Sequence, residues 1–200
     1  MKLCLGAGRY QLPQAQGWSN WDEDPETPAD RHVHVPPIDL PDGSVDEIFM
    51  GHLLEHFEPD EADALLRECC RVLTPTGRLA VVVPDTRAVL EHYLAGDHTT
   101  VELPERTYWS LDDLDSVCAT FLFSTIQRSR HRWAYDDRSL RYALHRAGFG
   151  VTYPLAPDDP RIGVPAWWNL GLEARKLPLP AAPVPVIDLT LLGPKPEAGA

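Results

Sequence analysis

The stretch Leu3–Asp22, LCLGAGRYQLPQAQGWSNWD, decides how this chain folds. It opens with an apolar run, turns at the tripeptide Gly6-Ala7-Gly8, and ends in a second strand-like run whose last residue is Asp22. Glycine lets a ligand approach the backbone closely, and an acid at the tip of the neighbouring strand can accept hydrogen bonds from ribose hydroxyls. The pattern therefore predicts a nucleotide-like ligand here, although a Gly-x-Gly pair alone also occurs in ordinary tight turns.

The composition suits one domain with a single sizeable core, because the chain has 200 residues of which 44% are hydrophobic. Its formal net charge of −12 argues against nonspecific binding to nucleic acid or to an anionic membrane, since phosphate contacts need a basic face. The four cysteines lack a C-x-x-C spacing and are interpreted as reduced packing residues, and no metal site is predicted.

The first expected strand begins at Lys2, which leaves no room for a secretion signal. No apolar run approaches the ~20 residues that a membrane-spanning helix needs. We therefore expect a cytoplasmic protein.

Strand and helix patterns alternate along the rest of the chain. We expect strands at 31–35, 45–50, 79–83, 150–155 and 167–175, and helices at 59–73, 86–94, 110–122 and 137–147. The uninterrupted apolar run Leu79–Val83 indicates a central parallel strand that is covered on both faces. This order predicts an open, layered α/β sheet. Residues 177–200 are rich in proline, which cannot donate to a β-ladder, and are interpreted as a C-terminal tail.

Seven motifs in a fixed order resemble the class I S-adenosylmethionine-dependent methyltransferases. The resemblance is to the minimal group related to predicted methyltransferases of glycan and secondary-metabolite clusters. The motifs are LGAG (5–8), GWSNWD (17–22), LPDGSVDEI (40–48), GHLLEH (51–56), RECCRVLTPTGRL (67–79), VVPD (82–85) and HRWAYD (131–136). The resemblance implies a single Rossmann-like domain over residues 1–176, with a mostly parallel seven-stranded sheet and a C-terminal antiparallel hairpin. The connection 9–17 contains a proline and is too short for the usual first helix, so that helix is expected to be reduced.

The resemblance also implies the cofactor S-adenosyl-L-methionine, with S-adenosyl-L-homocysteine as product. The residues that it assigns to cofactor binding are Leu5, Gly6, Ala7 and Gly8 along the methionine moiety, Asp22 at the ribose, His34 beside adenine, and His52 on the methionine side. Three departures leave some contacts open. No acid precedes the first glycine pair, Tyr10 takes the place of the third glycine, and His34 takes a position that often holds aspartate.

Methyl transfer from a sulfonium mainly requires alignment of donor and acceptor. A hydroxyl acceptor is too weakly acidic to react unaided and would be helped by a base or a metal, whereas an amine may need neither. The candidate catalytic residues are His52 after the fourth strand, Asp85 after the fifth, and His131 in the HRWAYD segment. Asp85 could equally begin a helix, and the HRWAYD aromatics could simply anchor a long connection. Glu55 and His56 are interpreted as structural.

The resemblance implies a methyltransferase, and the usual company of the group that it resembles implies methylation of an oxygen of a sugar, glycan or small metabolite. The alternatives are an N-methyltransferase of a small amine and a noncatalytic regulatory or partner domain that binds the same cofactor. A nicotinamide-dependent oxidoreductase is disfavoured, since Tyr10 and Pro13 supply neither a third glycine nor a full helix. The expected partner is a small-molecule or glycan acceptor, without nucleic acid or membrane, and a homodimer is left open.

Overall fold

The computed structural model describes residues 1–95, 102–103, 106–107, 131–162 and 167–176. One sheet of seven strands has the order β3-β2-β1-β4-β5-β9-β8. Its strands are β1 (Lys2–Leu5), β2 (Trp18–Asp22), β3 (Arg31–His32), β4 (Val45–Gly51), β5 (Leu73–Pro84), β8 (Phe149–Pro154) and β9 (Asn169–Lys176). The first five are parallel to one another, whereas β9 is antiparallel to both β5 and β8. This arrangement confirms the predicted α/β fold. A separate two-stranded sheet pairs β6 (Glu102–Leu103) with β7 (Arg106–Thr107).

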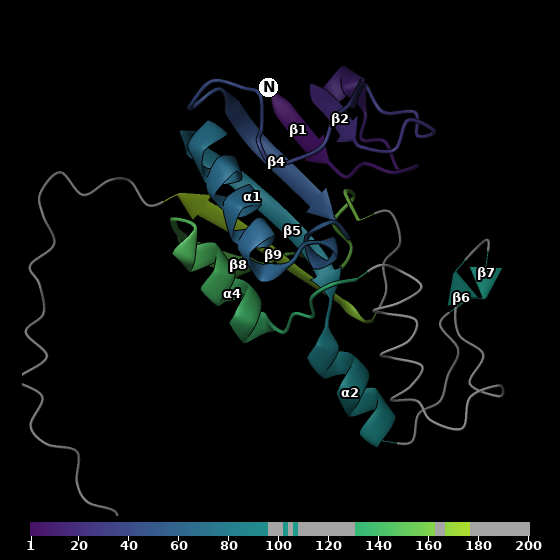
Figure 1. Ribbon diagram of the computed structural model, residues 1–200. Coiled ribbons are helices and arrows are strands. Elements are labelled where there is room, and N and C mark those ends of the chain that lie inside the picture. Colours follow the sequence, from purple (N-terminus) through teal and green to yellow (C-terminus); the bar gives the residue numbers. More distant parts are fainter. Residues whose placement is uncertain (96–101, 104–105, 108–130, 163–166, 177–200) are drawn as a thin grey trace, which may run out of the picture.

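One face of the sheet is covered by helices α1 (Pro59–Val72) and α4 (Asp137–Arg146), as Figure 1 shows. α1 begins at a capping box in which Glu58 and Glu61 satisfy each other's backbone donors. Its buried stripe follows the helical spacing predicted from the sequence and consists of Ala62, Leu65, Leu66, Cys69 and Val72. These side chains join inward-facing residues of all the long strands in one core.

The opposite face of the sheet is covered differently, because no helix of the described residues lies on it. A single 3-10 turn, η1 (Gln14–Gln16), replaces the usual first helix, as predicted. A smaller apolar cluster, which includes Cys4, Phe49 and Val82, lies on this face under Leu155 and Ile162 of the connection after β8. The strand run Leu79–Val83 is therefore buried on both faces, as its apolar sequence predicted.

Several boundaries differ from the predictions. The strand expected at 31–35 ends at His32, because its partner β2 ends at Asp22, whose carbonyl accepts the last hydrogen bond from Val33 N–H at 2.8 Å. Helix α2 (Thr86–Leu94) extends from the carboxyl end of β5 away from the sheet (Figure 1). The helix expected at 110–122 and the tail at 177–200 lie outside the described residues. Among the described helices, none has the length and apolar character needed to cross a bilayer.

Candidate functional site

The glycine turn after β1 and the acid at the end of β2 lie together at the carboxyl edge of the sheet. Gly6 and Gly8 have positive φ angles of 64° and 54°, which glycine adopts without strain. The backbone N–H of Gly8 donates to Asp22 Oδ2 at 2.7 Å, and that of Ala7 donates to the carbonyl of Trp21 at 3.1 Å. Open space lies where a side chain at Gly8 would be. The structure therefore brings Leu5–Gly8 and Asp22 together, and their assignment to a cofactor stays a prediction.

The segment after β4 packs directly against this turn. A Cβ atom at Gly6 would lie 2.7 Å from Cδ1 and 3.0 Å from Cβ of Leu53, so a side chain there would force Leu53 to move. His52, beside it, has φ of 53°, a left-handed backbone conformation that is uncommon for a residue other than glycine and is concentrated at functional sites. Its backbone N–H donates to the carbonyl of Val82 at 2.8 Å, which holds it at the tip of β4.

A group of histidines surrounds one buried carboxylate next to this segment. Glu55 lies in the 3-10 turn η2 (Leu54–His56), and its side chain is only 2% exposed. Glu55 Oε1 lies 3.2 Å from His52 Nδ1 and 3.8 Å from His131 Nε2. Oε2 of the same carboxylate has no hydrogen-bond partner among the described residues. We call Glu55, His52, His56 and His131 the edge cluster.

His131 enters the edge cluster from the segment before α4. The backbone N–H groups of Arg132 and Trp133 donate to the carbonyl of Glu55 at 2.8 and 3.1 Å, which fixes this segment against η2. The rings of His131 and His56 meet edge to face with their centroids 4.8 Å apart. Burial lowers the pKa of His131 to about 4, with Glu55 opposing the shift and the neighbouring histidines adding to it. His131 is therefore a neutral imidazole at neutral pH.

Glu55, His56 and His131 each offer one ligand atom, and these atoms all lie within 4.8 Å of one another. The sequence alone predicts no metal site and favours structural roles for Glu55 and His56. The GHLLEH motif contains two of these three residues, Glu55 and His56, but His131 comes from a distant segment and could not be paired with them from the sequence.

The remaining predicted site residues are engaged in other contacts. Asp85 Oδ1 accepts from the backbone N–H groups of Arg87 and Ala88 at 3.0 and 3.2 Å, so this carboxylate caps α2. His34 is exposed, and its Nδ1 lies 2.8 Å from Oε2 of Glu23. Glu23 is the residue that follows Asp22 in the sequence. His34 thus follows the end of β3, and Asp85 follows the end of β5, so the two residues come after different strands of the sheet.

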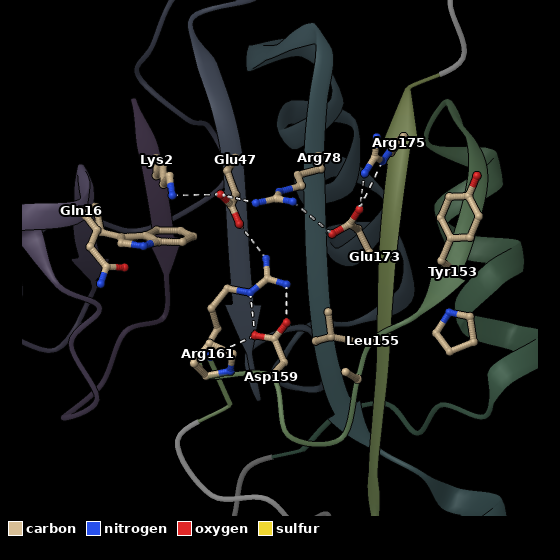
Figure 2. A pocket seen from close by; sticks show the side chains of 14 residues that line it. Lys2, Gln16, Glu47, Arg78, Tyr153, Leu155, Asp159, Arg161, Glu173 and Arg175 are labelled. Atoms are coloured by element: carbon tan, nitrogen blue, oxygen red, sulfur yellow. Dashed lines mark hydrogen bonds and ion pairs between the residues drawn. The ribbon is translucent and has the colours of Figure 1, made fainter.

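A second polar region, which is not predicted from the sequence, lies on the face of the sheet without helices (Figure 2). An open groove of about 700 Å³ lies over the amino-terminal parts of the strands. We call its charged side chains the face network. They are Lys2, Glu47, Arg78, Asp159, Arg161, Glu173 and Arg175. The sequence does hold a sign of the face network, because charged residues occupy strand positions that would be expected to face a core.

The face network is built around Glu47, whose side chain is 5% exposed. Its carboxylate accepts from Arg161 Nη1 at 2.7 Å and from Arg78 Nη2 at 3.0 Å, and Lys2 Nζ lies 3.3 Å away. Burial alone would raise the pKa of Glu47, but the hydrogen bond and charge of Arg78, with Arg161 and Lys2, hold it below its usual range. Asp159 accepts from Arg161 at 2.7 and 2.8 Å. Every buried carboxylate here has a cationic partner.

The chain is similar to known proteins in part of its sequence and in its fold. A sequence model of the family described as "Methyltransferase domain" matches residues 23–81, which is less than half of the chain. No curated protein matches.

Solved structures with the same fold include a SAM-dependent methyltransferase from Archaeoglobus fulgidus, with a TM-score of 0.55, 15% identity, and 88% of this chain and 85% of that chain covered. A structure described as a possible histamine N-methyltransferase from Thermotoga maritima has a TM-score of 0.52, 15% identity, and 88% and 82% coverage. The mitomycin 7-O-methyltransferase MmcR has a TM-score of 0.53, 17% identity, and 88% and 48% coverage. These structures share the fold of this chain, and the sequence match to the methyltransferase domain is confined to residues 23–81.

Proposed function

We propose that this protein is a SAM-dependent methyltransferase that transfers a methyl group to an oxygen of a sugar, a glycan or a small metabolite. The observation that carries the proposal is the contact between the Gly8 backbone and the Asp22 carboxylate at the carboxyl edge of the sheet. In open α/β sheets, ligands bind at this edge, near the point where the strand order reverses. Here the order reverses at β1, which lies between β2 and β4.

The residues at this edge fit the cofactor. The turn Leu5–Gly8 leaves open space at Gly8 for the methionine moiety. Asp22 already accepts from two backbone N–H groups, those of Gly8 and Asp24, and a carboxylate has about four acceptor positions, so two remain for ribose hydroxyls. His34 would lie beside adenine. The bound cofactor supplies an electrophilic methyl group on a sulfonium.

The protein's own contribution is to orient the acceptor, exclude water and remove a proton. His52 is the proposed base, because its Nδ1 lies 3.2 Å from Glu55 Oε1 while its side chain stays 36% exposed. The tautomer protonated at Nδ1 donates to Glu55, which leaves Nε2 to accept the proton of an acceptor hydroxyl. The Glu55 carboxylate would then stabilise the imidazolium that forms. His131 would line the acceptor side, and Asp85 would position the segment before α2.

Transfer to a small amine is the second candidate, and one solved structure of this fold is described as a possible histamine N-methyltransferase. An amine acceptor that is already neutral needs no base, so the two candidates differ in their dependence on His52. A third candidate is a noncatalytic domain that binds the cofactor, favoured by the absence of an acid before the glycine turn.

Formation of S-adenosyl-L-homocysteine, measured over panels of hydroxyl and amine acceptors, tests the proposal. The variant His52→Asn is the sharpest, because asparagine tolerates the left-handed backbone at this position. We expect turnover with a hydroxyl acceptor and a loss of roughly 10²-fold in His52→Asn, as is typical for a general base. The exposed His145→Asn in α4 serves as the matched control and should keep full activity. Turnover only with amines and independent of His52 would favour N-methylation, and absence of product with every acceptor would favour the noncatalytic domain.

A further inference from the structure

The edge cluster contains a buried charge that the described protein does not neutralise. Glu55 is 1% exposed, and no lysine or arginine of the described residues lies within ion-pair distance of its carboxylate. An isolated buried carboxylate is costly, so such groups are normally paired with a cation or coordinate a metal. The only neighbouring groups within 4 Å that can carry positive charge, in the described part of the chain, are imidazoles.

The side chains around Glu55 are of the types that bind metal ions. Glu55 Oε2 and His131 Nδ1 are both buried and have no hydrogen-bond partner among the described residues. The ring of His56 lies beside that of His131 rather than hydrogen-bonded to it. One ligand atom from each of the three residues lies within 4.8 Å of the others. Metal–ligand bonds of about 2.1 Å in a tetrahedral site place ligand atoms ~3.4 Å apart, so small rotations of the partly exposed His56 ring would close the set.

We propose that Glu55, His56 and His131 bind one divalent transition-metal ion, with Zn²⁺ as the first candidate. Imidazole and carboxylate ligands together suit Zn²⁺ and its first-row neighbours, whereas Mg²⁺ and Ca²⁺ prefer oxygen ligands alone. Two histidines and one glutamate leave a fourth position open, which is the arrangement of a catalytic rather than a structural zinc site.

The same carboxylate links this ion to the proposed base. Glu55 Oε1 accepts from His52 Nδ1, while Oε2 is free to coordinate the ion. The role of the ion rests on the methyltransferase function proposed above. At the open position the ion would bind an acceptor hydroxyl and lower its pKa, so that His52 could remove the proton at neutral pH.

Isothermal titration of the EDTA-treated full chain with ZnCl₂, and separately with MgCl₂, tests the proposal. We expect one Zn²⁺ per chain and no comparable binding of Mg²⁺. Removing even an outer-shell partner of a metal costs 10- to 100-fold in affinity, so Glu55→Gln and His56→Ala should each weaken Zn²⁺ binding at least ~10-fold. His145→Ala, which removes an exposed histidine of α4, should bind Zn²⁺ as the wild type does. Circular dichroism confirms that each variant folds, and the partly exposed His56 provides a variant that removes little packing.

The visible spectrum of the Co²⁺-loaded protein gives an independent readout. Ligation by imidazole and carboxylate gives d–d bands without a thiolate charge-transfer band. A wild type that does not bind Zn²⁺, variants that bind it as tightly as the wild type, or a thiolate band would each overturn the proposal. Titration of the same EDTA-treated protein with S-adenosyl-L-homocysteine separates the two failures. Nucleoside binding without zinc binding refutes only the metal site, and zinc binding without nucleoside binding refutes only the methyltransferase.

Discussion

The molecule buries charged side chains in two places, and the two places differ in how those charges are paired. In the face network, the buried carboxylate of Glu47 contacts three cations, and Arg161 is shared between Glu47 and Asp159. In the edge cluster, the ion-pairing groups that the described residues place within 4 Å of the Glu55 carboxylate are all histidines, and one of its oxygens has no hydrogen-bond partner among these residues. Buried polar groups in native proteins are normally satisfied. We infer that the face network serves the fold and that the edge cluster serves a ligand.

The face network also compensates for the first helix that this sheet face lacks. A sheet face without a covering helix would expose apolar side chains to water. Here the long cationic side chains lie over aromatic rings, with Arg161 5.8 Å from the Phe49 centroid and Lys2 5.3 Å from that of Trp18. Their methylene stems cover apolar surface while their charged ends are paired. The reduced connection between β1 and β2 is therefore compatible with a closed core.

Removing the central carboxylate of the face network should give the largest effect on stability. Glu47→Ala leaves Arg161, whose side chain is 12% exposed, without one of its two partners, and breaking a buried ion pair costs about 3 kcal/mol or more. Urea unfolding measures the loss, and binding of S-adenosyl-L-homocysteine should be retained. Asp46→Ala, at the adjacent exposed position, is the control and should cost under about 1 kcal/mol. A Glu47 variant as stable as this control would remove the distinction between the two regions.

The equivalent change in the edge cluster should have the opposite sign. Glu55→Gln keeps the shape of the side chain and an acceptor for His52 but removes a buried charge that no described cation neutralises. In the presence of EDTA we expect stability to be unchanged or raised by about 1 kcal/mol. A loss above about 2 kcal/mol in the same urea assay would mean that the carboxylate is structural and that the comparison is wrong.

Acidification should weaken the face network in a way that depends on Arg161. Burial opposes the shift at Glu47, yet Arg78 and the other cations hold its pKa below the ordinary 4.5, and hydrogen bonds from Arg161 lower that of Asp159 below 3.8. A lowered folded-state pKa contributes stability that is complete above these values and is lost as the pH falls through the folded-state values. Urea unfolding between pH 7 and pH 3 should therefore show a smaller acid-dependent loss in Arg161→Gln than in the wild type. Equal losses would exclude Arg161 as the cause.

The smallest effect is expected at the exposed margin of the face network. Arg175 pairs with Glu173 at 2.9 Å, but its side chain is 52% exposed. Exposed ion pairs are screened by water and contribute little, so Arg175→Ala should change the free energy of unfolding by less than about 0.5 kcal/mol. A loss similar to that of Glu47→Ala would show that the whole network, rather than its buried centre, carries the stability.

Local chemistry made much of the fold predictable from the sequence. Gly6 and Gly8 mark the turn because glycine alone adopts their backbone angles without strain, and the stripe around Leu65 and Leu66 marks α1 by its helical spacing. The end of β3 was not predictable, because it depends on where β2 stops.

The candidate site was predictable only where its residues are close in sequence. Asp22 and the glycine turn belong to one short segment, and the structure joins them by one hydrogen bond. Glu55 and His131 come from segments that only the folded sheet brings together, as do Glu47 and Arg161, which are 114 positions apart. No local pattern encodes such pairs. For Asp85, both interpretations were visible in the sequence, and the structure shows its carboxylate capping α2.

We propose above all that the carboxyl edge of this sheet holds a sulfonium nucleoside through Asp22. Isothermal titration with S-adenosyl-L-homocysteine tests it most directly, with wild type, Asp22→Ala and the control Asp24→Ala compared. Hydrogen bonds to a charged group contribute about 1.5–3 kcal/mol, so Asp22→Ala should bind roughly 10- to 100-fold more weakly while Asp24→Ala binds as the wild type does. Equal affinity in Asp22→Ala, or no binding by the wild type, would contradict the account.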